Sequence, residues 1–146
     1  PLKCSVDLKE GKKVDVKMGS YGIGVSRLVG AIIEAKFNNN IMKWPDQISP
    51  YDVVIIPTVK KNDKDNFLKA EKICNELKKN NIDVLVDDTD EHLSAKFKKF
   101  DIIGIPNQII LGSKSENDKI EFKEVDGKSE NLSLDEIKIK LLNKRN

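Results

Sequence analysis

Hydrophobic residues follow two different periods in the first fifty residues of the chain. Between residues 13 and 18, apolar and charged residues alternate, which is typical of a half-exposed strand. Apolar residues then recur at helical spacing, at Val25, Leu28, Val29, Ile32 and Ile33. This spacing predicts a helix that ends near Lys36. Residues 41–50 contain two prolines and no period, so we interpret them as a linker.

A second pattern begins at residue 51 and predicts an α/β domain. The predicted strands are residues 51–57, 83–87, 107–111 and 120–125. The predicted helices are residues 64–79, residues 93–100 capped by Ser94 or a neighbour, and a last helix that runs to about Leu142. Ser133 and Glu136 form a capping-box pair that opens this last helix. The order β-α-β-α-β-β-α predicts a mixed β-sheet flanked by helices.

Arginine is scarce in this chain. Lysine and arginine total 26 against 24 acidic residues, and the net charge of +2 predicts no strong attraction to nucleic acid or membrane. Only Arg27 and Arg145 are arginine, and Arg145 lies in the C-terminal tail. Because guanidinium offers a planar fork that lysine lacks, Arg27 is a candidate for recognising an anion.

The cysteines and the histidine do not form a metal-binding pattern. Cys4 and Cys74 are far apart, and we interpret both as free thiols in a reducing compartment. His92 is the only histidine, and we interpret it as a loop residue. No apolar run approaches the roughly 20 residues of a membrane span, and no signal-peptide pattern is present. We therefore expect a cytoplasmic protein with no metal site and no membrane partner.

Three glycines precede Arg27 in the stretch "GSYGIGVSR", and we expect them to form a tight turn. The stretch has P-loop glycine spacing, but Val25 stands where the phosphate-binding lysine is needed. It also has the first two glycines of a dinucleotide fingerprint, with Arg27 in place of the third. Both motifs are excluded. Two interpretations remain: Arg27 binds a phosphate at the helix N-terminus, or it is a solvated residue after a tight turn.

The stretch "MGSYGIGVSRLVGAIIE", residues 18–34, resembles motif 3 of the class II aminoacyl-tRNA synthetases in its prolyl form. The resemblance continues through "IMKWPDQISPYDVVIIP", "NIDVLVDD" and "AKFKKFDIIGIPNQIILG", and it points to the bacterial-type prolyl-tRNA synthetases. It implies three parts. Residues 1–40 are the end of the class II catalytic domain, residues 41–50 are a linker, and residues 51–146 are the anticodon-binding domain.

The resemblance also implies roles for residues near motif 3. Arg27 is expected to bind the γ-phosphate of ATP and to stabilise the leaving pyrophosphate as a catalytic residue. Gly22 and Gly24 are expected to form the floor of the adenylate pocket, and Ser20 to lie in the amino-acid pocket. ATP, with Mg²⁺, is a substrate of the intact enzyme. Motifs 1 and 2 are absent from this chain, so we expect the chain alone to be inactive and to bind no cofactor.

The acidic stretch "VDDTDEHLSAKF", residues 86–97, follows a predicted strand, at the sheet edge where ligands bind in α/β folds. Proline anticodons share two guanines, whose Watson–Crick edges carry two donors beside an acceptor. Asp88 and Glu91 can accept from these donors, and Lys96 can donate to the acceptor or to phosphate. Phe97 is a stacking candidate, with a core role as its alternative. A solvated acidic loop is the alternative for the carboxylates.

The stretch also departs from its relatives, in which two arginines occupy part of the region that here reads Thr89, His92, Leu93 and Ser94. Phosphate contacts made by those arginines are therefore in question. Lys96, Lys98 and Lys99 are the candidate substitutes.

The resemblance therefore implies that the chain is the C-terminal part of an enzyme that activates proline with ATP and charges tRNA(Pro). Its own role is to recognise the anticodon loop. The intact enzyme is expected to be a homodimer and the chain alone a monomer. One alternative is a stand-alone accessory tRNA-binding protein with a domain of the same kind. A nucleotide-binding enzyme is disfavoured by the missing lysine and the missing third glycine.

Overall fold

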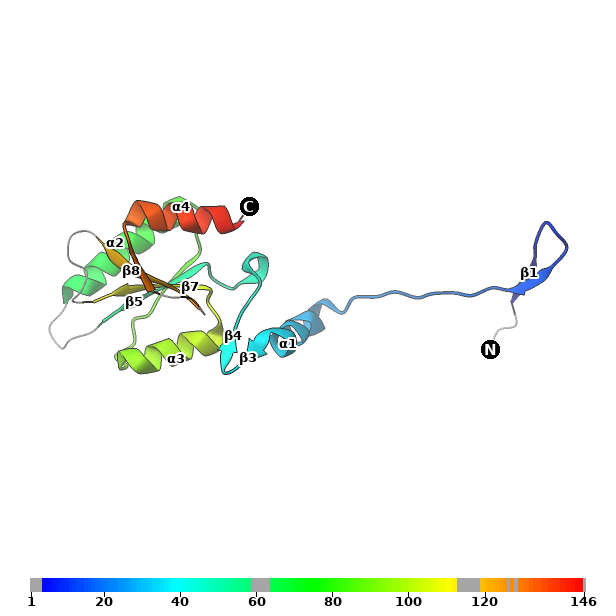
Figure 1. Ribbon diagram of the computed structural model, residues 1–146, viewed down its shortest axis with the longest axis horizontal. Helices are drawn as coiled ribbons and strands as arrows, with labels where there is room; N and C mark the ends of the chain where they lie inside the picture. Colours follow the sequence, from blue (N-terminus) through cyan, green and yellow to red (C-terminus); the bar gives the residue numbers. More distant parts are fainter. Residues whose placement is uncertain (1–3, 59–63, 113–118, 126, 128, 146) are drawn as a thin grey trace.

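A five-stranded sheet forms the centre of the fold, with the strand order β6-β5-β7-β8-β9 (Figure 1). The computed structural model describes residues 4–58, 64–112, 119–125, 127 and 129–145. The strands are β5 (Val53–Pro57), β6 (Val84–Val86), β7 (Asn107–Leu111), β8 (Ile120–Glu124) and β9 (Ser129–Leu132). Strands β6, β5 and β7 are parallel, whereas β8 and β9 are antiparallel to their neighbours. The predicted mixed sheet is confirmed.

Helices cover both faces of this sheet, as Figure 1 shows. Helices α2 (Lys64–Lys79) and α4 (Leu134–Arg145) lie on one face, and α3 (Leu93–Ile103) lies on the other. Strand β5 is buried on both sides: Val53 and Ile55 join the core beneath α2 and α4, and Val54 and Ile56 join the core beneath α3. This continuous burial explains why the strand reads as an unbroken apolar run.

The sequence prediction missed the edge strand β9 and left the N-cap of α3 open. Strand β9 is an edge strand in which only Leu132 is partly buried, so its sequence carries no apolar alternation. Helix α3 runs three residues beyond the predicted end, and its N-cap is His92, whose side chain makes no capping bond. Of the two expected possibilities, the cap is therefore a neighbour of Ser94 and not Ser94 itself. The predicted capping box is confirmed, since the Ser133 N–H donates to Glu136 Oε2 at 2.8 Å and the Glu136 N–H donates to Ser133 Oγ at 3.3 Å.

The segment interpreted as a linker contains regular structure. Strands β3 (Phe37–Asn38) and β4 (Ile41–Met42) form a short antiparallel pair, followed by the 3-10 helix η1 (Asp46–Ile48). Met42 is only 2% exposed and lies against Gly104 at the end of α3. The indole N–H of Trp44 donates to the Ile103 carbonyl at 2.8 Å. Two-residue strands leave no period in a sequence, which is why the prediction found none.

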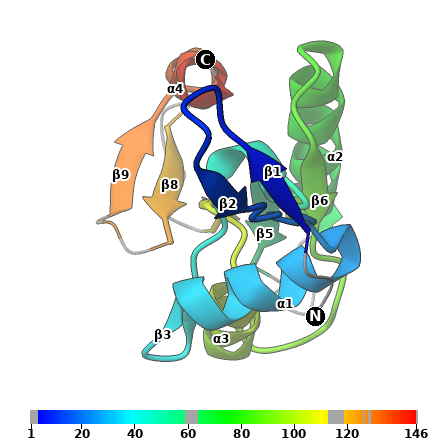
Figure 2. The ribbon, with the colours of Figure 1, turned by 90° about the vertical axis from the view of Figure 1, so that its right-hand side faces the viewer.

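The N-terminal part of the chain forms an extended arm with a hairpin at its far end (Figure 1). Strand β1 (Ser5–Asp7) pairs with β2 (Lys13–Asp15), which is shorter than the strand predicted over residues 13–18. The predicted helix is confirmed as α1 (Val25–Lys36), and it contains no buried residue. Figure 1 shows α1 between the extended arm and the β3–β4 pair, and Figure 2, with the arm turned toward the viewer, shows α1 in front of the sheet. None of the described helices combines the length and apolar character that a membrane span needs.

The expected tight glycine turn is not formed. Residues 16–24 run without helix, strand or turn until α1 begins. Among the glycines that the structure describes, only Gly11 and Gly104 have positive φ, at 74° and 83°. Gly19, Gly22 and Gly24 therefore adopt backbone conformations open to other residues.

Candidate nucleic-acid interface

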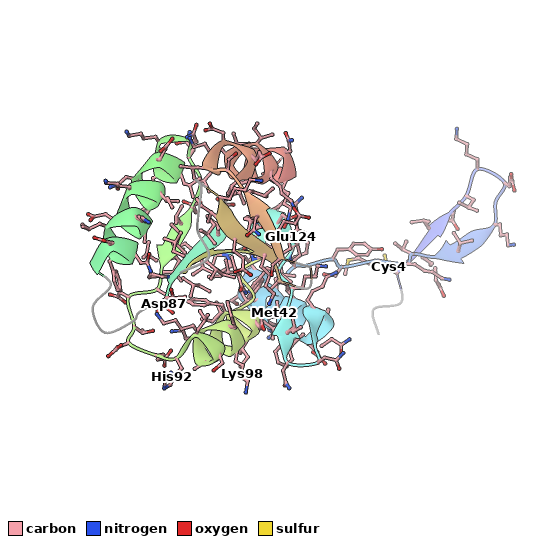
Figure 3. The ribbon with its side chains drawn as sticks, turned by 60° about the vertical axis from the view of Figure 1, so that its left-hand side comes forward. Cys4, Met42, Asp87, His92, Lys98 and Glu124 are labelled. Atoms are coloured by element: carbon pink, nitrogen blue, oxygen red, sulfur yellow. The ribbon has the colours of Figure 1, made fainter. Side chains whose placement is uncertain are left out.

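Asp87 anchors the acidic loop at the C-terminal end of β6. Its backbone N–H continues the sheet by donating to the Ile55 carbonyl at 2.9 Å, and the residue is only 4% exposed. Its Oδ1 atom accepts from the backbone N–H of Thr89 at 3.1 Å and from the Thr89 hydroxyl at 2.7 Å. These two bonds close an Asx turn, which directs the chain out of the sheet and toward α3. Figure 3 shows Asp87 at this end of the domain.

Two lysines of α3 face the Asp87 carboxylate. The ammonium of Lys96 lies 3.6 Å from Oδ2, and the ammonium of Lys99 lies 3.3 Å from the same atom. Burial opposes ionisation of Asp87, but the Thr89 hydrogen bonds and the two lysine charges outweigh it and lower the pKa of Asp87 below its ordinary value. The carboxylate is therefore ionised at neutral pH and ties β6 to α3.

Lys99 joins Asp87 to the outer part of the loop. Its ammonium donates to Glu91 Oε2 at 2.9 Å and to Thr89 Oγ1 at 3.2 Å, in addition to its contact with Asp87. The hydrogen bond to Glu91 raises the pKa of Lys99 above its ordinary value, with burial acting the other way and Asp87 adding to the rise. Lys99 thus supplies a donor to each of three loop residues, which holds residues 87–91 in one conformation.

The predicted base-reading carboxylates are both exposed. Among the described residues, Asp88 makes no hydrogen bond or ion pair, so its oxygens are available to a ligand. Glu91 uses only Oε2 in its contacts with Lys99 and Thr89. The loop therefore presents acceptor atoms to solvent, while the contacts of Asp87 and Lys99 fix its conformation.

Lys96 lies in a different place from the one its proposed role requires. The sequence analysis gave it a direct contact with RNA, but only 1% of the residue is exposed. Its ammonium makes no hydrogen bond to the part of the chain that the structure describes, and its charge is compensated by Asp87 alone. Lys99, with 31% of its side chain exposed, is the lysine that reaches the surface beside Glu91.

Phe97 is half-buried, with part of the residue in the core and part at the surface. One side of the residue packs against the core that contains Val54 and Phe100. The ammonium of Lys123, on β8, lies 5.4 Å from the centroid of the Phe97 ring. The core role is therefore real, and part of the ring remains at the surface.

The residues that resemble motif 3 are not brought to this loop. Ser20, Gly22, Gly24 and Arg27 are all exposed, and they lie on the arm and the first turn of α1 (Figure 1). The Arg27 backbone N–H donates to the Gly24 carbonyl at 3.0 Å, which closes the first turn of the helix. The structure thus contains two separate sets of candidate residues, one near α1 and one around α3.

The two cysteines are not joined to each other. Cys4 is exposed, Cys74 is buried, and both are free thiols. Within the described ranges, no three His, Cys, Asp or Glu side chains come together as metal ligands would.

Sequence reasoning named Lys99 only as a substitute phosphate contact, and it missed that Thr89 and Lys99 hold the loop together. Thr89 was read only as a departure from relatives, yet its hydroxyl bonds Asp87, Glu91 and Lys99. A usable signal was present: Lys96 and Lys99 are three residues apart, so they share the side of α3 that faces the strand end. Nothing in the sequence distinguished the buried lysine from the exposed one.

Comparison with known proteins identifies this part of the chain. A family model described as an anticodon binding domain matches residues 52–144. The chain is 54% identical over 138 residues to the proline–tRNA ligase of Pelagibacter ubique (strain HTCC1062), covering 93% of this chain and 31% of that protein. It is 42% identical over 137 residues to the proline–tRNA ligase of Rhodopseudomonas palustris (strain BisB5), covering 92% of the chain and 31% of the relative. The chain thus spans about a third of the length of these relatives.

Proposed function

Because the chain belongs to the anticodon-binding domain family, we propose that it binds the anticodon loop of a transfer RNA. The observation that carries this proposal is the loop of residues 87–91, which presents free carboxylate oxygens while Lys99 and Asp87 hold it in place. Single-stranded loops are read through the edges of their bases, and fixed acceptors match the N1–H and N2–H donors of guanine.

We further propose that the RNA is tRNA(Pro), since the similar proteins of known name are proline–tRNA ligases. Proline anticodons share two guanines, and Asp88 and Glu91 are the residues placed to accept from them. Lys99 lies beside Glu91, and it would donate to the guanine O6 atom by exchanging one of its three contacts within the loop. In this proposal Lys96 does not contact the RNA, and its buried charge compensates the charge of Asp87. Phe97 offers the exposed part of its ring to a base.

The experiment is a titration of the 146-residue chain with two anticodon stem–loops, one with the two guanines and one with both replaced. The parent is expected to prefer the guanine loop. Asp88→Asn or Glu91→Gln should remove about 1–3 kcal/mol of that preference, on the scale of bidentate base readout. Glu71→Gln removes the same charge from an exposed position on α2 and is the control. Equal losses on both loops for the acidic variants would show that the carboxylates do not read bases.

We propose that the chain is the C-terminal part of a proline–tRNA ligase, which activates proline with ATP and charges tRNA(Pro) in the cytoplasm. In the intact enzyme, a homodimer, Arg27 binds the ATP γ-phosphate with Mg²⁺, Gly22 and Gly24 line the adenylate pocket, and Ser20 lies in the amino-acid pocket. Residues 1–40 belong to the catalytic domain in this proposal, and residues 51–146 to the anticodon-binding domain. The exposure of α1 supports the assignment of residues 1–40 to a catalytic domain. One side of α1 is apolar, yet none of its residues is buried, and such a side is expected to pack against further parts of a catalytic domain.

The catalytic part of this proposal has its own test. The chain alone, expected to be a monomer, should not support proline-dependent exchange of pyrophosphate into ATP. In the intact ligase, Arg27→Ala should lower activation by about ten- to a hundredfold, which corresponds to one charge-assisted hydrogen bond. Arg27→Lys should recover only part, because it lacks the fork. Activation at the parental rate by Arg27→Ala would overturn the assignment.

A stand-alone accessory tRNA-binding protein is the second candidate. It shares the anticodon-loop interaction but has no use for the glycines and arginine before α1. Removal of residues 4–36 would distinguish the two in cells, because only the ligase part requires that segment for charging.

A further inference from the structure

Strand β8 presents a polar side to the same layer as α3. Ile120 and Phe122 belong to the core beneath α2 and α4. Successive side chains of a strand point to opposite faces, so Glu121 and Lys123 point to the α3 side. Lys123 is paired in register with Gln108 of β7, and its ammonium lies over the ring of Phe97 from α3. A lysine from the sheet thus meets an aromatic residue from the helix.

Lys123 differs from the paired lysines of the domain. Several other lysines of the described chain hold at least one carboxylate each, among them Lys96, Lys99, Lys138, Lys140 and Lys144. For Lys123, by contrast, the described residues supply no carboxylate and no hydrogen-bond acceptor, and its one contact is the Phe97 ring at 5.4 Å. Glu121 shares its face of the strand without forming an ion pair with it among the residues described. The charge of Lys123 is therefore uncompensated within the described structure.

An aromatic ring beside an uncompensated cation matches the chemistry of single-stranded nucleic acid. Such proteins stack bases on aromatic side chains and hold the phosphates with lysine or arginine. The position fits this partner because Phe97 lies on α3, the helix that begins two residues after the loop of residues 87–91, while Lys123 lies on β8, beyond β5 and β7 from the strand that leads into the loop. An acidic peptide would meet the exposed carboxylates of that loop, which repel it. Guanine bases instead offer donors to those carboxylates.

We propose that Lys123 is a further RNA-contacting residue, which binds a backbone phosphate of a nucleotide whose base lies against Phe97. The inference deepens the proposed anticodon binding and rests on it. It extends the RNA surface from the acidic loop, across α3, to strand β8. In this arrangement the loop supplies sequence preference, and Lys123 supplies affinity that does not depend on sequence.

The test is a titration of the 146-residue chain and its variants with the guanine loop and the guanine-replaced loop at several salt concentrations. Lys123→Gln should weaken binding to both loops by the same factor. It should also reduce the slope of log Kobs against log salt by about 0.7, the value for one phosphate contact on a single strand. Lys123→Arg should keep the parental slope. Lys72→Gln, which removes an exposed charge from α2, should leave the slope nearly unchanged.

The outcomes separate this inference from the proposal on which it rests. Binding by the parent, together with an unchanged slope for Lys123→Gln, would overturn the Lys123 contact and leave anticodon binding intact. An equal loss for Lys123→Gln and Lys72→Gln would also overturn it, because the effect would then be one of net charge. A base-dependent loss for Lys123→Gln would assign Lys123 to a base instead of a phosphate. Failure of the folded parent to bind either loop would overturn both proposals.

Discussion

The buried carboxylate of Asp87 is stable as an ion because of the bonds around it. Its Oδ1 atom accepts two bonds from Thr89, while Oδ2 faces the ammonium groups of Lys96 and Lys99 without a close hydrogen bond to Lys96. Burying two charges costs several kcal/mol per ion before their attraction is counted. The pair therefore depends on both partners, and removing one leaves the other charge in an apolar surrounding.

Asp87→Asn keeps the shape of the side chain and leaves Lys96 without its buried counter-ion. We expect a loss of about 3–5 kcal/mol in the free energy of unfolding. The double variant Asp87→Asn with Lys96→Met should be more stable than Asp87→Asn alone, because no charge is then stranded. Urea unfolding measures both, with the exposed Asp88→Asn as a control that should stay within about 0.5 kcal/mol of the parent. A nearly parental Asp87→Asn would contradict the buried pair.

Acid should destabilise the domain through the same group. The pKa of Asp87 is lower in the folded chain than its ordinary value of about 3.9. Its stabilising contribution is therefore complete above that ordinary value and is lost as the pH falls from there through the folded pKa. Unfolding free energy measured from pH 6 downward should decline more steeply for the parent than for Asp87→Asn. Parallel curves would show that Asp87 carries no folded-state pKa shift.

At the scale of elements, the sequence predicted those whose hydrophobic pattern is long. Helix α2 and strand β7 have their predicted bounds, because each repeats its period several times or is apolar throughout. Strands β3, β4 and β9 were missed, since they are short or lie at an exposed edge and their residues carry no pattern. The site was predicted in part. The place of residues 87–91 directly after β6 indicated an acidic loop. The burial of Lys96 and the hydrogen bonds of Thr89 could not be predicted, because they depend on how α3 packs against the sheet.

Helix α3 ends at Gly104. In the sequence, this glycine was noted only as one residue of a stretch that resembles a known family. Gly104 is the C-cap, with φ of 83°, and its N–H donates to the Phe100 carbonyl. A Cβ placed there would lie 2.6 Å from Met42 Cγ and 2.7 Å from the Met42 backbone oxygen. The position therefore requires glycine for its conformation and for its space.

Gly104→Ala should lower the unfolding free energy by more than the roughly 1–2 kcal/mol of a left-handed residue alone. The additional loss comes from displacing β4 from α3. Gly30→Ala on α1 is the matched control, since a Cβ there meets nothing within 4 Å. It should not lower the stability of the domain. Thermal or urea unfolding compares the two, and equal effects would contradict the close approach of Met42 to α3.

For the whole molecule, the arm and the sheet are separate in space (Figure 1). Strand β1 pairs with β2 in a two-stranded sheet of its own, whereas β5, β7 and β8 belong to the five-stranded sheet. Removal of residues 4–24 should therefore leave the urea midpoint of the domain unchanged, as followed by the near-ultraviolet signal of Trp44. A lowered midpoint would show that the arm packs on the domain in solution.

The central claim is that the surface around α3, and not the opposite face, binds an anticodon loop. The most direct measurement is an NMR titration of the isotope-labelled 146-residue chain with the guanine-containing stem–loop. We expect amide shifts to change at residues 87–99 and at Lys123, with little change along α2 and α4. Changes concentrated on α2 and α4, or no change at RNA concentrations well above those of the protein, would contradict the account.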